Sequence, residues 1–469
     1  MSEPRPSLPA PLRCPRCAGL LLVRSAEQLA CGDCPAVHPV YDGLPWLYPD
    51  VASSRGQWAA KLQRFRDEIT GELASLDRSL AAKDRMRSTR DRLARLRAGS
   101  ERLGRQVFGL LEPFAFASSE VSARLPRDRI PSRQHFSSYL ETVFRDWCWG
   151  EDEVQTTLGL LEPLLGGAPA GRDALVLGGG AGRLAYELAR LGDWGSVIQL
   201  DINPLLGRVG ALLARGESVV LTELPRMPMG LEHVAVDQTL ERPPAPPGAP
   251  LHHLIGDLFT PPFAPESFDL LLTPWLVDIL PESFDRVARR LGGLLAPGGS
   301  WISFGPLSFE SLPLTDRYTR EEMEEALERA GLEVETSELR RVPYLHSPHG
   351  MPRRSEEILV FRAIRKGPVV PIEAPFSLYP AWMTDPERSV PASPRFEQMR
   401  HERVFEGEIL ACIDGRASIR DIVQTLSRRY SLPAERCENA VNGFFAKIYE
   451  AAAERAVDQP VDQSVDQPV

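Results

Sequence analysis

A short apolar strand that runs into a glycine-rich turn constrains the fold of this chain most strongly. Residues 174–177 read Ala-Leu-Val-Leu, residues 178–182 read Gly-Gly-Gly-Ala-Gly, and a helical pattern follows up to Leu191. Glycines in such a turn let the backbone approach a ligand closely, and the first turn of the helix offers free amide groups to that ligand. The sequence therefore predicts a ligand site where this strand ends.

The residues after the turn alternate between short apolar strands and amphipathic helices, which is typical of a parallel α/β sheet. We expect a further helix over residues 281–295 and a loop over the proline-rich residues 241–250. These elements predict a Rossmann-like α/β domain over residues 135–366. Its expected strands cover residues 174–177, 196–200, 252–255, 268–273, 300–304 and 356–362.

An acidic residue, Asp201, stands at the end of the second strand, 23 residues after Gly178. A carboxylate in this place can accept hydrogen bonds from both hydroxyl groups of a ribose. The turn and Asp201 together predict a nucleotide-type cofactor. A nicotinamide-dependent oxidoreductase would fit these two features equally well, so the rest of the domain has to distinguish the alternatives.

Two cysteine pairs precede this domain, Cys-Pro-Arg-Cys at residues 14–17 and Cys-Gly-Asp-Cys at residues 31–34. The spacing presents four thiolates to one tetrahedral Zn²⁺, and four protein ligands leave no open position for a catalytic water. We predict a zinc ribbon over residues 10–50 with a structural zinc ion. Redox-active or metal-free cysteine pairs are the alternative. The predicted ligands are Cys14, Cys17, Cys31 and Cys34.

Two amphipathic helices are predicted within a helical arm over residues 55–134, because apolar residues recur there at steps of three and four. The arginines of the second helix are interspersed with acidic residues, which favours a solvated face over a site for an acidic partner. After the Rossmann-like domain we expect a proline-rich linker over residues 367–394, a helical module over residues 395–455 and a disordered tail over residues 456–469.

Composition excludes some functional classes. The formal net charge of -10 disfavours general binding to nucleic acid, which relies on Lys and Arg side chains that neutralise phosphates. The sequence has neither a long apolar run nor the apolar stretch of a secretory signal, and its cysteine spacing does not suggest a disulfide framework. We expect a cytoplasmic protein with no nucleic-acid or membrane partner.

Motifs later in the domain resemble those of class I S-adenosylmethionine-dependent methyltransferases. Asp257 follows the third strand, and Leu-Ala-Pro-Gly-Gly at residues 295–299 precedes the fifth. Residues 142–365 resemble the carnosine N-methyltransferase-like family more specifically, since the matching segments occur in the right order. These segments are Phe-Arg-Asp-Trp at 144–147, Gly178 to Leu184 with its continuation, Leu272-Thr273, Val277-Asp278, Pro-Gly-Gly at 297–299, Trp-Ile-Ser-Phe-Gly-Pro-Leu at 301–307 and Val-Pro-Tyr at 342–344.

The resemblance implies roles for individual residues. It places Arg145 at the carboxylate of the methionine moiety and Asp201 at the ribose, whereas an ordinary salt bridge is the alternative role of Arg145. Gly178, Gly180 and Gly182 would pack beneath the methionine moiety, Asp257 and Leu258 would border the adenine, and Thr273 would also contact the cofactor.

The residues expected around the methyl acceptor match the family pattern less closely than the cofactor residues do. Tyr344 corresponds to a tyrosine near the substrate of the family, and Asp278 is predicted to orient an acceptor imidazole and accept its proton. Trp275, His346 and His349 lie in segments that should approach the methyl group, although each histidine also fits a packing or surface role. Where the family has a histidine after Gly-Pro-Leu, this chain has Ser-Phe-Glu at residues 308–310, so carnosine itself is not the expected substrate.

The C-terminal segment resembles the leader-peptide-binding PqqD-like modules of ribosomal peptide pathways. It shares the pattern Ile-Asp-Gly-x-x-Ser at residues 413–418, followed by Ile422, Leu426 and Tyr430. The sequence as a whole therefore predicts an S-adenosylmethionine-dependent methyltransferase, acting on an imidazole or amine nitrogen of a small molecule or of a peptide that the module could deliver. A non-catalytic peptide-binding scaffold and a nicotinamide-dependent oxidoreductase are the alternatives.

Overall fold

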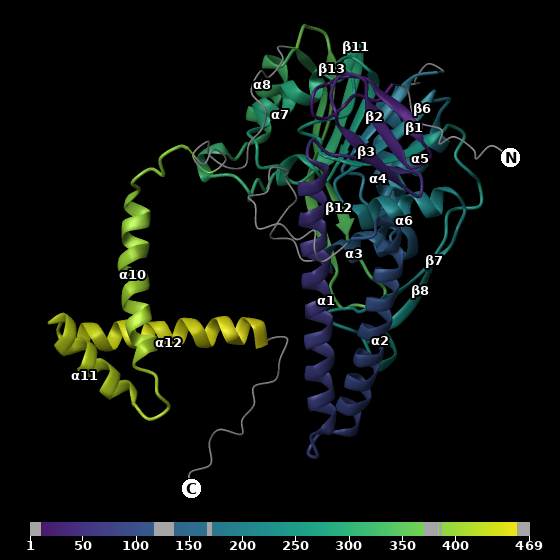
Figure 1. Ribbon diagram of the computed structural model, residues 1–469. Helices are drawn as coiled ribbons and strands as arrows, with labels where there is room; N and C mark the ends of the chain where they lie inside the picture. Colours follow the sequence, from purple (N-terminus) through teal and green to yellow (C-terminus); the bar gives the residue numbers. More distant parts are fainter. Residues whose placement is uncertain (1–10, 117–135, 167–170, 370–382, 384–386, 457–469) are drawn as a thin grey trace. The chain divides into compact units, whose positions relative to one another are not determined.

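The computed structural model describes residues 11–116, 136–166, 171–369, 383 and 387–456 (Figure 1). The chain divides into two compact units. One contains Asp84–Leu378 together with the segment up to Thr70, and the other contains the C-terminal helices. The predicted tail at residues 457–469 and most of the predicted linker lie outside the described residues.

Eleven of the described strands form one continuous sheet, in the order β1-β2-β3-β4-β9-β6-β5-β10-β11-β13-β12. Strands β9, β6, β5, β10 and β11 are parallel, whereas β13 pairs antiparallel with β11 and with β12. The strand order reverses at β5, and ligands of open α/β sheets bind at such a switch point. The strands are β5 (Asp173–Leu177), β6 (Ser196–Asp201), β9 (Leu251–Gly256), β10 (Phe268–Pro274), β11 (Leu295–Gly305), β12 (Leu332–Tyr344) and β13 (Arg354–Arg365).

The central strands are apolar on both sides because helices cover both faces of the sheet. Alternate residues of β5 face different layers: Leu175 and Leu177 belong to a core with α7 and α8, while Ala174 and Val176 belong to a core with α4 and α5. The helices that cover the sheet are α4 (Glu151–Leu165), α5 (Arg183–Leu191), α6 (Pro204–Ala214), α7 (Phe284–Gly292) and α8 (Arg320–Arg329).

The ribbon consists of antiparallel strands that extend this same sheet. Its last strand, β4, lies parallel to β9, with Trp46 opposite Ile255 and Leu47 opposite Gly256. The ribbon core is continuous with the core of the sheet, since Leu12 and Leu29 pack in one cluster with Phe259. The strands are β1 (Leu21–Ser25), β2 (Gln28–Cys31), β3 (Val37–Tyr41) and β4 (Leu44–Leu47).

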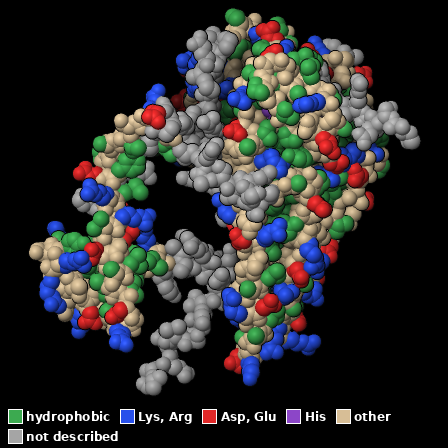
Figure 2. Space-filling view, viewed as in Figure 1, with side chains coloured by type: hydrophobic (Ala, Val, Ile, Leu, Met, Phe, Trp, Pro, Cys, Tyr) green, Lys and Arg blue, Asp and Glu red, His purple; other side chains and the backbone are tan. Residues whose placement is uncertain are grey.

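The helical arm contains α1 (Val51–Ala81) and α2 (Arg87–Leu111), followed by the short helix η1 (Glu112–Phe114). Basic and acidic side chains both appear along α2 in the space-filling view (Figure 2). Some of its arginines form exposed ion pairs, such as Arg97 with Glu101 at 3.1 Å. After the gap at 117–135, α3 (Ser138–Phe144) and a one-turn π-helix, η3 (Arg145–Trp149), lead into α4.

The structure contains strands that the sequence pattern did not predict. β12 follows no clean apolar alternation, because it pairs only with β13 and most of its side chains are exposed or half-buried. A separate hairpin of β7 (Val219–Glu223) and β8 (Val236–Leu240) is inserted between α6 and β9. The short helices of these loops are η4 (Leu231–His233), η5 (Val277–Ile279) and η6 (Leu314–Asp316).

The C-terminal helices form a small unit with its own core. Ile409, Ile422, Leu426 and Val441 are buried in it. A turn at Asp414 and Gly415 precedes α11, and the Asp414 carboxylate accepts hydrogen bonds from the N–H groups of Arg416 and Ala417 at 2.8 and 2.7 Å. The helices are α10 (Pro394–Ala411), α11 (Ile419–Tyr430) and α12 (Ala434–Ala456).

The predicted Rossmann-like α/β fold is confirmed, together with an N-terminal four-cysteine ribbon, a helical arm and a small C-terminal helical domain. The antiparallel strand β13 also sets the sheet apart from the mostly parallel sheet of the dinucleotide-binding fold. Among the helices that the structure describes, none combines the length and the apolar character needed to span a bilayer.

Candidate cofactor and acceptor site

The turn after β5 has a backbone that favours glycine. Gly178, Gly180 and Gly182 have φ angles of +63°, +62° and +94°, in the left-handed region that strains other residues. A Cβ atom on Gly180 would lie 2.9 Å from Thr142 of α3, and one on Gly178 would lie 2.8 Å from Leu276 after β10. The turn is therefore held tightly between α3 and the loop that follows β10.

Asp201 lies beside this turn at the end of β6. Its carboxylate is buried and accepts a hydrogen bond from the N–H of Asn203 at 2.8 Å. Burial raises the pKa of Asp201 to about 7, although hydrogen bonds from the backbone of Asn203 and Gly180 oppose this increase. The structure thus brings the predicted residues Gly180 and Asp201 together, and added hydroxyl donors would favour the ionised carboxylate.

Asp257 and Leu258 follow β9, which is the neighbour of β6, so they lie at the same edge of the sheet as Asp201. Asp257 is buried, and its carboxylate accepts a hydrogen bond from the N–H of Phe259 at 2.9 Å. Thr273, near the end of β10, is fully buried, and its hydroxyl accepts a hydrogen bond from the Trp301 indole N–H at 2.8 Å. The Thr273 side chain is therefore engaged with the neighbouring strand.

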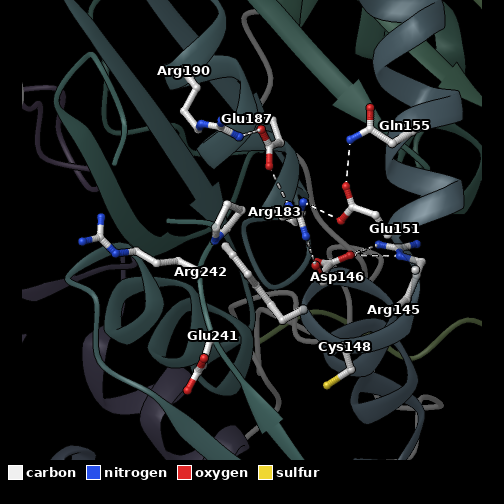
Figure 3. A pocket seen from close by; sticks show the side chains of 13 residues that line it. Arg145, Asp146, Cys148, Glu151, Gln155, Arg183, Glu187, Arg190, Glu241 and Arg242 are labelled. Atoms are coloured by element: carbon white, nitrogen blue, oxygen red, sulfur yellow. Dashed lines mark hydrogen bonds and ion pairs between the residues drawn. The ribbon is translucent and has the colours of Figure 1, made fainter. Parts of the chain in front are cut away.

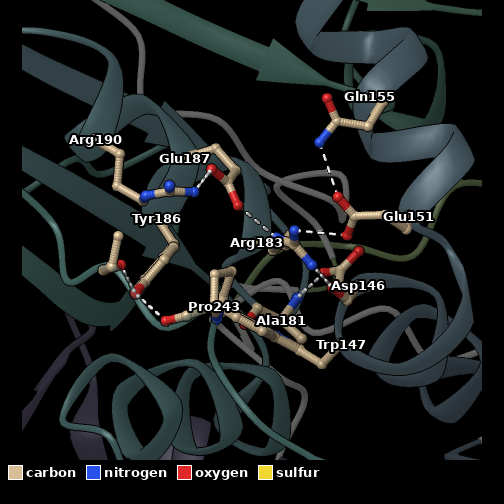
Figure 4. A network of polar contacts seen from close by, with 11 residues as sticks. Asp146, Trp147, Glu151, Gln155, Ala181, Arg183, Tyr186, Glu187, Arg190 and Pro243 are labelled. Carbon is tan, nitrogen blue, oxygen red and sulfur yellow. Dashed lines mark hydrogen bonds and ion pairs between the residues drawn. The ribbon is translucent and has the colours of Figure 1, made fainter.

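Arg145 reaches the glycine turn through a neighbour that the sequence analysis did not single out. Its Nε and Nη2 atoms donate to Asp146 Oδ1 at 2.9 and 2.7 Å (Figure 3). Asp146 Oδ2 accepts the N–H of Ala181 at 2.9 Å (Figure 4). Arg145 does form a salt bridge, but its partner is itself bound to the turn. Both residues lie in the π-helix η3, and such one-turn insertions are frequent at functional sites.

The same network continues into α5. Arg183 donates to Glu187, to Glu151 and to the Asp146 carbonyl at 2.8, 2.8 and 3.1 Å. These groups border a polar pocket of about 310 Å³ whose lining includes four arginines and four acidic residues (Figure 3). The charges balance, and neither the glycines of the turn nor Asp201 line the pocket. Among the predicted cofactor residues, Arg145 alone lines this pocket.

The predicted acceptor residues gather around the loop after β10. The ring of Tyr344 stacks on Trp275 with centroids 4.4 Å apart and planes at 29°, and Arg354 lies 5.2 Å from the Tyr344 centroid. Burial raises the pKa of Tyr344, which keeps its hydroxyl protonated. Trp275 itself has a φ angle of +51°, and strain of this kind is concentrated at functional sites.

Asp278 lies in the same loop, in η5, with 3% of its surface exposed. Its carboxylate accepts a hydrogen bond from the Ser308 hydroxyl at 2.6 Å, and burial raises the pKa of Asp278. Ser308 is one of the residues that replace the histidine of the resembling family. Ser308, which departs from the family pattern, therefore contacts the carboxylate of the predicted catalytic residue Asp278 directly.

His346 and His349 lie in the connection between β12 and β13. The His346 N–H donates to the buried Glu153 of α4 at 2.9 Å, and the His349 Nε2 atom lies 4.0 Å from Glu223 of β7. Ser347 also donates to Glu223, at 2.5 Å. The two acidic residues thus hold this connection in place, and sequence spacing gave no sign of either.

Tyr139 is a further residue that the sequence analysis missed. It comes from α3, and its buried hydroxyl has no hydrogen-bond partner among the described residues. Burial, and after it the negative charge of Asp201, raises the pKa of Tyr139. The hydroxyl is therefore an unpaired buried donor within reach of the charge of Asp201.

The four predicted zinc ligands converge. Their sulfur atoms all lie within 4.8 Å of one another, with Cys14 and Cys34 at 3.9 Å and Cys17 and Cys31 at 3.4 Å. Zn–S bonds of about 2.3 Å in a tetrahedron place sulfur atoms at such separations. The Nε2 atom of the buried His38 lies 3.6 Å from Cys14 Sγ, so this histidine supports a ligand from outside the cluster.

Comparisons with known proteins match parts of the chain. Residues 407–452 match the family model described as coenzyme PQQ synthesis protein D (PqqD). This segment lies inside the predicted module at 395–455. No curated protein matches the chain.

Similar solved structures include S-adenosylmethionine-dependent methyltransferases. One, from Methanosarcina mazei, has 16% identity and a TM-score of 0.31 and covers 43% of this chain and 96% of its own. A complex between the Haloferax volcanii Trm112 methyltransferase activator and a methyltransferase has 15% identity, covers 48% and 98%, and has a TM-score of 0.30. Phosphoethanolamine N-methyltransferase 2 from Haemonchus contortus has 13% identity, covers 45% and 52%, and has a TM-score of 0.28. Likenesses of this size assign no specific activity to the chain.

Proposed function

We propose that this protein is an S-adenosylmethionine-dependent methyltransferase that methylates a nitrogen atom of a small molecule or peptide. The observation that carries the proposal is the convergence of the glycine turn and Asp201 at the switch point of the sheet. A buried carboxylate that is close to half-protonated at neutral pH benefits strongly from donors, and a ribose supplies two of them.

In this proposal the residues around the turn and Asp201 would hold separate parts of the cofactor. The Nη1 atom of Arg145 makes no hydrogen bond within the described residues and could bind the carboxylate of the methionine moiety. Asp201, with Tyr139 beside it, would hold the ribose, and Asp257 and Leu258 would border the adenine. Thr273 would contribute through its backbone, since its hydroxyl is engaged by Trp301.

The acceptor would lie against the loop after β10. The bound cofactor supplies an electrophilic methyl group, and the protein has to hold the nucleophile in line with it at roughly 3 Å and exclude water. Trp275 and Tyr344 provide a rigid stacked pair for a planar or cationic acceptor. Asp278 would accept a proton from an imidazole or amine, while the hydrogen bond from Ser308 orients its carboxylate.

A peptide acceptor gains support from the PqqD match. We propose that the C-terminal helical module binds a peptide and presents it to the catalytic domain, and that the carnosine N-methyltransferase-like resemblance reflects a shared class of nitrogen acceptor. The zinc ion in this proposal is structural, held by Cys14, Cys17, Cys31 and Cys34 in a reducing, cytoplasmic compartment.

Label transfer tests the proposal. The zinc-loaded protein is incubated with deuterated-methyl S-adenosylmethionine and either a small-molecule fraction or a peptide fraction of cell extract, and products are detected by mass spectrometry. We expect a labelled product whose fragments place the methyl group on nitrogen. The same protein with Asp201→Asn is the control. Cofactor binding without transfer to either fraction would favour a non-catalytic scaffold, and NADH binding in place of S-adenosylmethionine would favour an oxidoreductase.

A further inference from the structure

The ribbon lies directly against the strand that leads to the candidate adenine residues. Leu47 of β4 is opposite Gly256 of β9, and Asp257 follows immediately. A Cβ atom on Gly256 would lie 2.6 Å from the Leu47 carbonyl oxygen, so the two strands approach as closely as a glycine permits. The end of the ribbon is thus fixed beside the candidate adenine residues.

The residue after β4 reaches the next strand as well. Tyr48 is fully buried, its ring packs against Trp46 with centroids 5.3 Å apart, and its hydroxyl donates to the carbonyl oxygen of Ile202 at 2.7 Å. Ile202 directly follows Asp201. One ribbon side chain therefore holds the backbone next to the candidate ribose carboxylate.

The hydrogen bond from Tyr48 acts on a single planar group. The carbonyl of Ile202 and the N–H of Asn203 belong to the same peptide unit, and they point in opposite directions. That N–H donates to Asp201 Oδ1 at 2.8 Å. The Tyr48 hydroxyl, the peptide and the carboxylate thus form a continuous chain of hydrogen bonds, in which the first bond polarises the peptide and strengthens the second.

We propose that Tyr48 of the ribbon is a positioning residue for the cofactor: it orients the Ile202–Asn203 peptide, which in turn orients Asp201 and favours its ionised form. This inference rests on the proposed role of Asp201 at the ribose. The ribbon, in this view, helps to build the cofactor site without contributing an atom that touches the cofactor.

The substitution Tyr48→Phe changes none of the other groups around Asp201 chemically. The titratable neighbours are Asp146 from η3 and Tyr139 from α3, and the remaining donors are the backbone N–H groups of Gly180 and Ile202. Tyr48→Phe removes only the hydroxyl. Tyr186→Phe is a matched control, because the buried Tyr186 also donates to a backbone carbonyl, that of Ala245 at 2.7 Å, away from Asp201.

The test measures the pKa of Asp201 in the full-length protein without cofactor, from the carbon-13 chemical shifts of labelled aspartate carboxyls, with Asp201→Asn to assign the signal. We expect Tyr48→Phe to raise this pKa and Tyr186→Phe to leave it unchanged. Thermal melting checks that both variants fold, and Tyr48→Leu provides a second variant without the hydroxyl. An Asp201 pKa that is the same in the wild type and in both Tyr48 variants would overturn the proposal, as would a collapse of both variants to an unfolded state.

Cofactor binding gives the second measurement. Calorimetric titration with S-adenosylmethionine at pH 6.5 should show an affinity about three- to tenfold weaker in Tyr48→Phe, with the wild-type affinity recovered at pH 9. A loss that is equal at both pH values would contradict positioning of the carboxylate and would indicate general loosening of the site. The carboxylate measurement needs no cofactor, so failure of the proposed function and failure of this inference are separate results.

Discussion

Replacing Asp201 with Asn should stabilise the protein at neutral pH while it abolishes cofactor binding. The pKa of Asp201 is raised from 3.8 to about 7, mainly by burial. Between these two values the folded protein keeps the proton that the unfolded chain has already lost. Stability therefore falls as the pH rises, by about 1.4 kcal/mol for each pH unit, until the carboxylate ionises in the folded state as well.

The magnitude follows from the size of the shift. About three pKa units correspond to a total cost of about 4 kcal/mol above pH 7, of which about 1.5 kcal/mol is already present at pH 5. Asn cannot ionise, and its side-chain oxygen can still accept the hydrogen bond from Asn203. The stability gained by Asp201→Asn should therefore be larger at pH 8 than at pH 5, by about 3 kcal/mol.

Urea unfolding of both proteins at the two pH values, followed by tryptophan fluorescence, measures this difference without a cofactor. Comparing the mutational effect at two pH values cancels changes in packing that do not depend on pH. Titration with S-adenosylmethionine should show no binding to the variant. An equal change in stability at pH 5 and pH 8 would show instead that the carboxylate ionises normally in the folded state.

Three further perturbations probe other parts of the site. Gly180→Ala places a Cβ atom 2.9 Å from Thr142, at a position with left-handed backbone. We expect the free energy of unfolding to fall by about 1–3 kcal/mol and calorimetry to show weaker cofactor binding. Unaltered binding would argue against the turn as part of the cofactor site. Removal of the metal with a chelator should lower both the melting temperature and the cofactor affinity, because the ribbon core continues into the core of the sheet. An unchanged melting temperature would show that the four cysteines bind no structural ion. Asp278→Asn should lower kcat about 10²-fold or more with little change in cofactor affinity, measured in a label-transfer assay; normal turnover would exclude Asp278 as a proton acceptor.

The central strands and the glycine turn after β5 could be predicted because local sequence determines them. A strand such as β5 is buried on both faces and is continuously apolar, and the turn after it has glycine at the three positions with left-handed backbone. The strand β12 follows no such pattern, because an edge strand with mostly exposed side chains needs no apolar alternation. Its position depends on pairing with β13, which the sequence of β12 alone does not specify.

Contacts between distant segments could not be predicted in the same way. The Asp146 carboxylate joins Arg145 to the turn, and Tyr48 reaches Ile202 across 154 positions of the chain. Each of these is an ordinary polar residue in the sequence, and it gains its role only when β4 pairs with β9 and η3 packs on the turn. The acceptor residues are intermediate: Asp278 and Tyr344 follow motifs, while the residues that hold them come from other elements.

Calorimetric titration of the zinc-loaded protein with S-adenosylmethionine at pH 8 tests the central claim most directly. The convergence of the glycine turn, Arg145 and Asp201 predicts one binding site per chain, with binding lost in Asp201→Asn and with NADH unable to compete. Failure of the folded, zinc-loaded protein to bind S-adenosylmethionine, or equal binding by the wild type and Asp201→Asn, would contradict the assignment of this crevice as a methyl-donor site.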